Sequence, residues 1–157
     1  MSGGYRIERL ADHDRLAFES GSEVLDRYFR EGVTQDTRRR MAYCFVALGP
    51  DQDVAGFYTL SATSVLLDNL PPARAKKLPR YPLVPAILLG RLAVSQAHQG
   101  KRLGSAMAAD ALLRATSGDI AGHLMVVDAK DENAARFYEH LEFTRLSSGG
   151  RRLIRAL

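Results

Sequence analysis

Apolar positions along the chain fall into two alternating patterns. Short runs rich in β-branched and aromatic residues predict strands, while longer stretches with apolar residues three and four apart predict helices. Ser22 is a good N-cap for the first helix, whose apolar stripe comprises Leu25, Tyr28, Phe29 and Val33. The predicted strands are residues 5–10, 41–48, 54–63, 86–94, 123–128 and a final strand or hairpin through 143–146 and 152–157; the later helices span 103–115, ended by Gly118, and follow a cap at Asp131.

This order of elements predicts an α/β (α+β) architecture, in which a mixed central sheet of six to seven strands carries helices on its faces. Residues 49–53, with the sequence GPDQD, are typical of a hairpin loop between two antiparallel strands. From 68 to 85, prolines interrupt regular structure and four basic residues are interspersed. We expect an exposed loop or a short helix there, as a candidate for contact with substrate.

Length and composition fit one domain, residues 1–157, that buries its own core. The chain is 46% hydrophobic and 25% charged, which is ordinary for a globular protein. It has no apolar run long enough for a bilayer and no signal-peptide pattern, so we expect a cytoplasmic protein without a membrane partner. The single Cys44 cannot form an internal disulfide and is predicted to be a buried hydrophobe without a catalytic role.

Basic residues gather in groups rather than spreading evenly. The formal net charge is only +4, so the grouping matters more than the total. Each group alone is most often a solvated face, but several beside one site would attract a polyanion such as nucleic acid. The groups are Arg38, Arg39 and Arg40; Arg74, Lys76, Lys77 and Arg80; Lys101 and Arg102; and Arg151, Arg152 and Arg155.

The segment QGKRLG, Gln99–Gly104, joins an apolar strand to a helix through a basic turn that contains two glycines. Amide groups of such a turn and the positive end of the helix dipole both favour an anion, and Lys101 and Arg102 add charge. A phosphate-bearing cofactor is one interpretation. The other is an ordinary strand–loop–helix junction in which glycine relieves backbone strain and the cations are solvated.

Three stretches of the chain, LGRLAV, QGKRLG and DENAARFYEHLEF, resemble the GNAT acyltransferases, which use acetyl-coenzyme A. The resemblance covers most of the chain and implies a GNAT fold with a splayed central strand pair. Within that superfamily the chain is similar to the toxin branch of bacterial toxin–antitoxin pairs. The segments that carry this narrower likeness are ESGSEVLDRYFREGVTQDTRRR, GFYTLSATSV, LPRYPLVPAILLGRLAV and AKDENAARFYEHLEF.

The resemblance implies where acetyl-coenzyme A binds. Backbone groups of the splayed strand would hydrogen-bond the pantetheine arm, the next turn would hold the pyrophosphate, and a later asparagine would bind the pantetheine chain. Arg102 departs from the family pattern, because glycine is commonest at its position; we expect its side chain to point outward and its φ to suit a non-glycine residue. The implied cofactor residues are Leu92, Ala93, Val94, Gln99, Gly100, Lys101, Arg102, Leu103, Gly104, Ser105 and Asn133.

Tyr138 corresponds to the tyrosine that the family uses as a general acid toward the coenzyme A thiolate, and backbone N–H groups near Val94 would hold the carbonyl oxygen. Its spacing from Ala134 and Leu141 also fits a core aromatic. His98, His123 and His140 are candidate bases by chemistry, but none has a partner pattern that marks it. No metal site is expected.

The toxin branch acetylates the α-amino group of aminoacyl-tRNA and thereby blocks translation. An α-amine has a pKa of about 8, against about 10.4 for lysine, so it needs no strong base at neutral pH. The alternatives are a GNAT enzyme acting on a protein N-terminus or small amine, and a non-catalytic acyl-CoA or nucleic-acid binding module. The resemblance also implies a homodimer and a ribbon-helix-helix antitoxin; candidate tRNA contacts are Arg38, Arg39, Arg40, Lys76, Lys77, Arg91, Lys101, Arg102 and Arg151.

Overall fold

The computed structural model describes residues 4–157, and the chain divides into two compact units. The first unit contains the chain up to Ser61 together with Gly90–Leu113, and the second contains Ala62–Leu89 together with Arg114–Leu157. Strands β3 (Val54–Leu66) and β4 (Leu83–Val94) have residues in both units. The prediction of a single domain stays a prediction.

The strands form one seven-stranded sheet in the order β1-β2-β3-β4-β5-β7-β6. Strands β4 and β5 run parallel, whereas β1/β2, β2/β3, β5/β7 and β6/β7 are antiparallel pairs. The mixed sheet that the sequence predicts is therefore confirmed, at the upper end of its expected size. The remaining strands are β1 (Arg6–Arg9), β2 (Tyr43–Leu48), β5 (Leu124–Asp128), β6 (Thr144–Arg145) and β7 (Arg152–Ala156).

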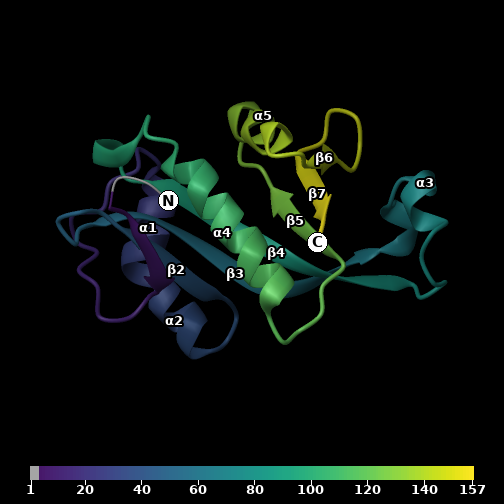
Figure 1. The fold of residues 1–157 in the computed structure, drawn as a ribbon, viewed down its shortest axis with the longest axis horizontal. Helices are drawn as coiled ribbons and strands as arrows, with labels where there is room; N and C mark the ends of the chain where they lie inside the picture. The colour runs from purple at the N-terminus through teal and green to yellow at the C-terminus, as the bar shows by residue number, and fades with distance from the viewer. Residues whose placement is uncertain (1–3) are drawn as a thin grey trace. The chain divides into compact units, whose positions relative to one another are not determined.

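In the first unit, alternation of side chains along β3 gives the sheet two covered faces. Phe57 stacks on Phe29 of the first helical segment with ring centroids 4.3 Å apart. The side chain of the next residue, Tyr58, lies on the opposite face, where its hydroxyl donates a hydrogen bond to Asp110 Oδ2 at 2.5 Å. Asp110 belongs to α4 (Leu103–Ser117), so helices cover both faces (Figure 1).

The helix predicted after Ser22 forms, with one irregularity. The Ser22 side chain accepts a hydrogen bond from the Leu25 N–H, and α1 (Glu23–Arg27) leads through a π-helical segment (Tyr28–Gly32) into α2 (Val33–Arg38). The predicted stripe faces the core, with Phe29 and Val33 fully buried. Cys44 is buried in the same cluster, as predicted.

The second unit is built on the pairing of β4 with β5 and of β5 with β7. Its core includes Val84 and Ala86 of β4, Leu124 and Val126 of β5, and Ile154 of β7. Helix α5 (Glu132–His140) follows β5 and begins at the predicted cap, where Asp131 Oδ1 accepts a hydrogen bond from the Ala134 N–H at 2.8 Å.

The stretch 68–85 contains the short helix α3 (Pro72–Ala75), which is one of the two structures expected there. A 3-10 turn (Leu67–Asn69) precedes the helix, and the start of β4 follows it. Pro85 lies inside β4, because a strand tolerates proline where the missing N–H has no ladder partner. Across residues 4–157, none of the helices has the length and apolar character needed to cross a membrane.

Candidate functional site

In the turn that begins at Gln99, the Gln99 side chain is held by hydrogen bonds, whereas the backbone at Gly100 is exposed. Gln99 Nε2 donates hydrogen bonds to the carbonyl oxygens of Ser20, at 2.8 Å, and Val94, at 2.9 Å. Gly100 has a φ of +79°, in the left-handed region that favours glycine, and no atom lies within 4 Å of the position a Cβ would take. The backbone there is accessible to an anion.

Arg102 corrects one expectation from the sequence. Its side chain is exposed, as predicted, but its φ is +62°, so the backbone adopts the left-handed conformation that a non-glycine residue rarely takes. The chain changes direction here to enter α4, and this change requires a positive φ at position 102 whichever residue occupies it. The preference of the family pattern for glycine therefore has a backbone cause.

Helix α4 begins directly after this residue. Leu103 is buried and anchors the first turn, and the Ala106 N–H donates to the Arg102 carbonyl at 3.2 Å. The N–H groups that precede it in a helix have no intrahelical acceptor, which includes those of Leu103, Gly104 and Ser105. With the exposed Lys101 and Arg102 beside them, these amides make an electropositive helix start suited to a phosphate group.

Strand β4, which precedes the turn, pairs with β5 over only part of its length. The pairing of β4 with β5 runs from Ala86 opposite Leu124 to Leu89 opposite Val127 and stops there, although β4 continues to Val94. Leu92, Ala93 and Val94 therefore lie beyond the paired stretch. The Val94 carbonyl oxygen accepts from Gln99 Nε2, and the other backbone groups on that edge are available to an extended ligand that adds like a strand.

His98 is a structural residue. The residue is only 8% exposed; Nδ1 lies 2.6 Å from the Tyr5 hydroxyl and Nε2 lies 2.6 Å from Asp53 Oδ2. A ring with its proton on Nε2 satisfies both contacts, accepting from Tyr5 and donating to Asp53. Because both nitrogens are engaged, His98 is not available as a general base.

The sequence gives no local signal for this arrangement, since Tyr5 and Asp53 lie 93 and 45 residues away along the chain. The hydrogen bond from His98 lowers the pKa of Asp53, which therefore remains a carboxylate.

Tyr138 lies on α5 among aromatic neighbours. Its ring makes edge contacts with Phe137 and Phe143, with centroids 5.0 and 5.5 Å away, and 8% of the residue is exposed. Burial raises the pKa of the phenol well above its usual range, so the group is protonated at neutral pH. Among the described residues its hydroxyl has no hydrogen-bond partner. The environment suits a proton donor as well as a core aromatic.

Asn133 lies exposed in the first turn of the same helix, where its Oδ1 accepts a hydrogen bond from Arg136 Nη2 at 2.5 Å. Its amide nitrogen points to no protein acceptor within the described part of the chain, so this half of the side chain can donate to a ligand. His140, also on α5, has its Nδ1 2.8 Å from the Arg136 carbonyl oxygen. That ring is thereby anchored to the helix backbone.

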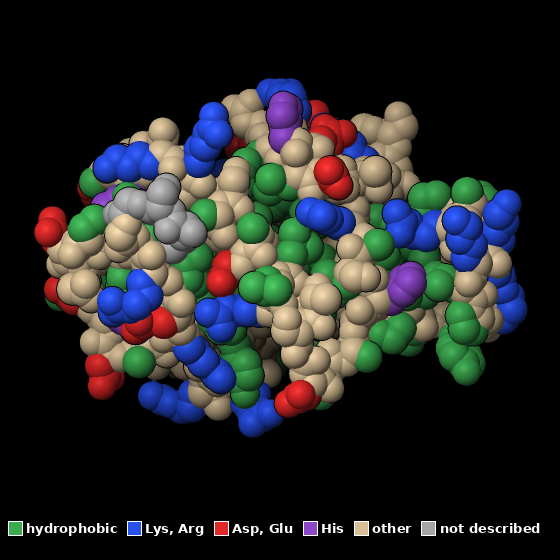
Figure 2. Space-filling model, in the orientation of Figure 1, with side chains coloured by type: hydrophobic (Ala, Val, Ile, Leu, Met, Phe, Trp, Pro, Cys, Tyr) green, Lys and Arg blue, Asp and Glu red, His purple; other side chains and the backbone are tan. Residues whose placement is uncertain are grey.

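The cationic side chains predicted to contact tRNA differ in whether they already contact other residues of the protein. Arg38, Arg39 and Arg40 are exposed at the end of α2, although Arg40 also lies over the Tyr43 ring, 6.0 Å from its centroid. By contrast, the Arg91 guanidinium stacks on the Tyr28 ring, 3.6 Å from its centroid, and Arg151 donates to the Lys130 carbonyl at 2.8 Å. Lys76 and Lys77 are exposed after α3, where Figure 2 has Lys and Arg side chains gathered beside a histidine.

The chain is similar to known proteins in sequence and in fold. Residues 40–145 match the model of the acetyltransferase (GNAT) domain. The tRNA-acetylating toxin of Mycobacterium tuberculosis (strain ATCC 25618 / H37Rv) is 35% identical over 146 residues, which cover 91% of this chain and 86% of that protein.

Three solved structures are similar over nearly the whole chain. AtaT complexed with acetyl-methionyl-tRNAfMet is 27% identical, with a TM-score of 0.87 over 97% of this chain and 94% of that one. AtaTR bound with AcCoA is 27% identical, with a TM-score of 0.82 over 98% and 94% of the two chains. An AtaT mutant toxin bound to the C-terminus of the antitoxin AtaR is 25% identical, with a TM-score of 0.79 over 98% and 93%.

Proposed function

The chain belongs to the GNAT acetyltransferase family, and from this we propose that it is a toxin that transfers the acetyl group of acetyl-coenzyme A to the α-amino group of aminoacyl-tRNA. Its relationship to the tRNA-acetylating toxin is the observation that carries the choice of substrate. Acetylation of that amine blocks its use in peptide-bond formation, so the product would arrest translation. A protein that acts on tRNA in this way works in the cytoplasm.

The residues of the turn fit acetyl-coenzyme A. The open backbone at Gly100, the amides that begin α4 and the cations of Lys101 and Arg102 would hold the pyrophosphate, together with Gln99, Leu103, Gly104 and Ser105. Leu92, Ala93 and Val94 would pair with the pantetheine arm through the part of β4 that β5 leaves unpaired, and Asn133 would donate to the same arm.

Bound acetyl-coenzyme A supplies an activated thioester, whose acetyl group passes to the amine as the bond from carbonyl carbon to sulfur breaks. Tyr138 would donate its phenolic proton to the departing sulfur, a role that its raised pKa supports because the group stays protonated. A backbone N–H near Val94 would stabilise the charge that develops on the carbonyl oxygen. The amine loses its proton to solvent, and the phenol is re-protonated from solvent afterwards.

The substrate's own chemistry accounts for a site without an assigned base. A fraction of an α-amine with a pKa of about 8 is already neutral at pH 7. His98 is engaged through both nitrogens, which removes one of the three histidines that could otherwise serve. Exposed cations, including Arg38, Arg39 and Arg40, would attract the tRNA polyanion.

We infer further that an antitoxin and a second copy of the chain are its protein partners. AtaT is solved with the C-terminus of its antitoxin, which supports a cognate antitoxin here. A ribbon-helix-helix class of antitoxin and a homodimer follow from the toxin branch. Co-expression with a candidate antitoxin of that class, followed by size-exclusion chromatography with light scattering, tests both.

The decisive experiment compares acetyl transfer from acetyl-coenzyme A to three acceptors: charged tRNA, deacylated tRNA and small free amines. We expect charged tRNA to be acetylated much faster than small free amines, and deacylated tRNA not at all, with the acetyl group recovered on the amino acid after mild alkaline release. Equal turnover with small amines or protein N-termini would replace the substrate. Binding without any turnover would indicate a non-catalytic module.

A further inference from the structure

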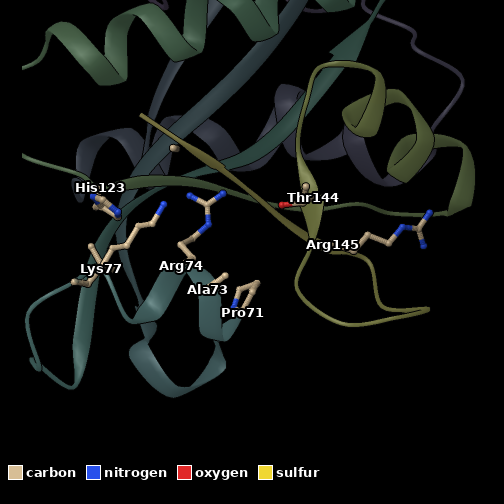
Figure 3. Close-up of a pocket in the computed structure, with 9 residues that line it drawn as sticks. Pro71, Ala73, Arg74, Lys77, His123, Thr144 and Arg145 are labelled. Atoms are coloured by element: carbon tan, nitrogen blue, oxygen red, sulfur yellow. The ribbon is translucent and has the colours of Figure 1, made fainter.

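A cavity of about 620 Å³ lies in the second unit, and none of its lining residues is assigned to acetyl-coenzyme A. Its walls come from α3 and the residues after it, from the residue that precedes β5, from the edge strand β6 and from β7. Three of its lining residues carry basic side chains from separate segments: Arg74, Lys77 and His123. Figure 3 shows Arg74 and Lys77 extending from the α3 segment toward the side where His123 lies.

These three side chains have no bonding partner among the described residues. Within residues 4–157, neither a hydrogen bond nor an ion pair engages the Arg74 guanidinium, the Lys77 ammonium or the His123 imidazole. The fourth basic residue of the lining, Arg145, differs, because its guanidinium pairs with Glu132 at 3.0 Å and Glu139 at 3.2 Å and points away from the others (Figure 3). The cavity therefore presents two uncompensated cations and a histidine, with no carboxylate in its lining.

The basic group that the sequence predicted around α3 is divided by the structure. Arg80 donates to the carbonyl oxygens of Ala75, at 2.7 Å, and Leu78, at 3.2 Å, and so closes the end of the α3 segment. Lys76 and Arg80 line a different hollow, which includes Asp68. Adjacent lysines thus face different surroundings, with Lys77 at the basic cavity and Lys76 outside it.

The dimensions and the lining indicate the class of ligand. A volume near 620 Å³ falls within the range of about 300 to 1,000 Å³ that ligand sites occupy, and it exceeds what a lone anion fills. Pro71, Ala73 and Leu78 add apolar surface beside the cations, against which a ribose or base can lie. Cations beside apolar surface suit a nucleotide unit better than an isolated ion.

We propose that this cavity binds a phosphodiester segment of the tRNA body, with Arg74 and Lys77 on the phosphate. The inference rests on the proposed function, since it adds a contact to the same substrate. Its contribution is to affinity and orientation and not to the chemical step. An acidic polypeptide and free phosphate are the competing ligands.

The test measures binding of labelled deacylated tRNA by fluorescence anisotropy over a range of salt concentrations. The variants are Arg74→Ala/Lys77→Ala and, as matched control, Lys76→Ala. All three side chains lie at the surface, and thermal melting verifies that the fold is retained. We expect the double variant to bind about tenfold more weakly and its salt dependence to fall by about two charges, one for each phosphate-contacting cation. The control should change affinity less than twofold and the salt slope by less than one.

The inference would be overturned if the double variant bound tRNA like the control, or if the wild-type protein did not bind tRNA. It would also be overturned if the double variant lost only its binding of inorganic phosphate or of poly-glutamate and bound tRNA normally. Kinetics separate this inference from the proposed function. If the inference is right, the double variant raises KM for charged tRNA and leaves kcat unchanged. A wild-type protein that binds tRNA through the cavity without acetylating its amino acid would refute the proposed function alone.

Discussion

His98 Nε2 lies 2.6 Å from Asp53 Oδ2, and this contact joins the 3-10 turn Gln96–His98 to the loop between β2 and β3. The Tyr5 hydroxyl completes the chain on the other side of the ring. The segment that leads into the proposed pyrophosphate turn is therefore held by residues from two distant parts of the first unit.

Replacing His98 with alanine should loosen the turn without removing a catalytic group. We expect the free energy of unfolding to fall by about 1 kcal/mol, because the substitution removes two side-chain hydrogen bonds whose partners, the half-exposed Asp53 and the partly exposed Tyr5, can still bond to water. KM for acetyl-coenzyme A should rise several-fold while kcat changes little. Chemical denaturation and steady-state kinetics measure these effects, with His140→Ala as the exposed control. A collapse of kcat at constant KM would instead identify His98 as a base.

Acid should weaken the same contact. The hydrogen bond from His98 lowers the pKa of Asp53 in the folded protein. Its stabilisation is thus fully present above the ordinary aspartate pKa of about 3.9 and is lost as pH falls through the lowered value. The difference in unfolding free energy between wild type and Asp53→Asn should therefore shrink as pH falls from 6 to 3. Urea titrations measure it, with Asp51→Asn, in the same loop, as the control substitution.

Local pattern predicted much of the fold, because caps and periodicity act within a few residues. The caps at Ser22 and Asp131 form as expected, and the stripe through Phe29 and Val33 is buried. Strand length was less predictable. β3 continues to Leu66 because its end is held by a distant partner: just beyond it, the Leu67 N–H donates to the Pro82 carbonyl at 2.9 Å.

The site was predictable only where its chemistry is contiguous in sequence. QGKRLG is such a segment, but the φ of Arg102 depends on how the turn enters α4, and an arginine at that position does not predict the left-handed conformation. Arg91 illustrates the other limit. It is a predicted tRNA contact, and its guanidinium stacks on the ring of Tyr28, from a helical segment far away in the chain, a contact that local sequence does not reveal.

At Arg102, two substitutions separate the effect of the backbone conformation from the effect of the side-chain charge. Arg102→Gly relieves the left-handed strain, whereas Arg102→Ala retains it, so the glycine variant should have the higher unfolding free energy, by about 1 kcal/mol. Both variants lose the cation and should raise KM for acetyl-coenzyme A a few-fold. Thermal and chemical denaturation test the order of stability. At Lys101, whose φ is not positive, Gly should be no more stable than Ala; the same order at both positions would contradict the backbone argument.

Tyr138→Phe should remove the proton donor and preserve the fold. The phenol makes no hydrogen bond within the described structure, so its loss leaves no partner unsatisfied. We expect kcat for charged tRNA to fall by about 10² to 10⁴, with melting temperature and tRNA affinity nearly unchanged. Tyr81→Phe, at an exposed tyrosine, is the matched control. Near-normal turnover in Tyr138→Phe would mean that this tyrosine only packs against Phe137 and Phe143.

The pH dependence of turnover tests the acid and the amine together. The rate with a small α-amino amide, chosen because it lacks the alkali-labile ester, should rise as the amine deprotonates near pH 8. It should then stay level to about pH 10.5, because burial keeps the pKa of Tyr138 above the ordinary tyrosine value of about 10. Initial rates, with melting curves at each pH to verify folding, measure the profile. A fall in rate with a midpoint near pH 10, at constant fold, would show that the proton donor is a group with an ordinary pKa, not the buried phenol.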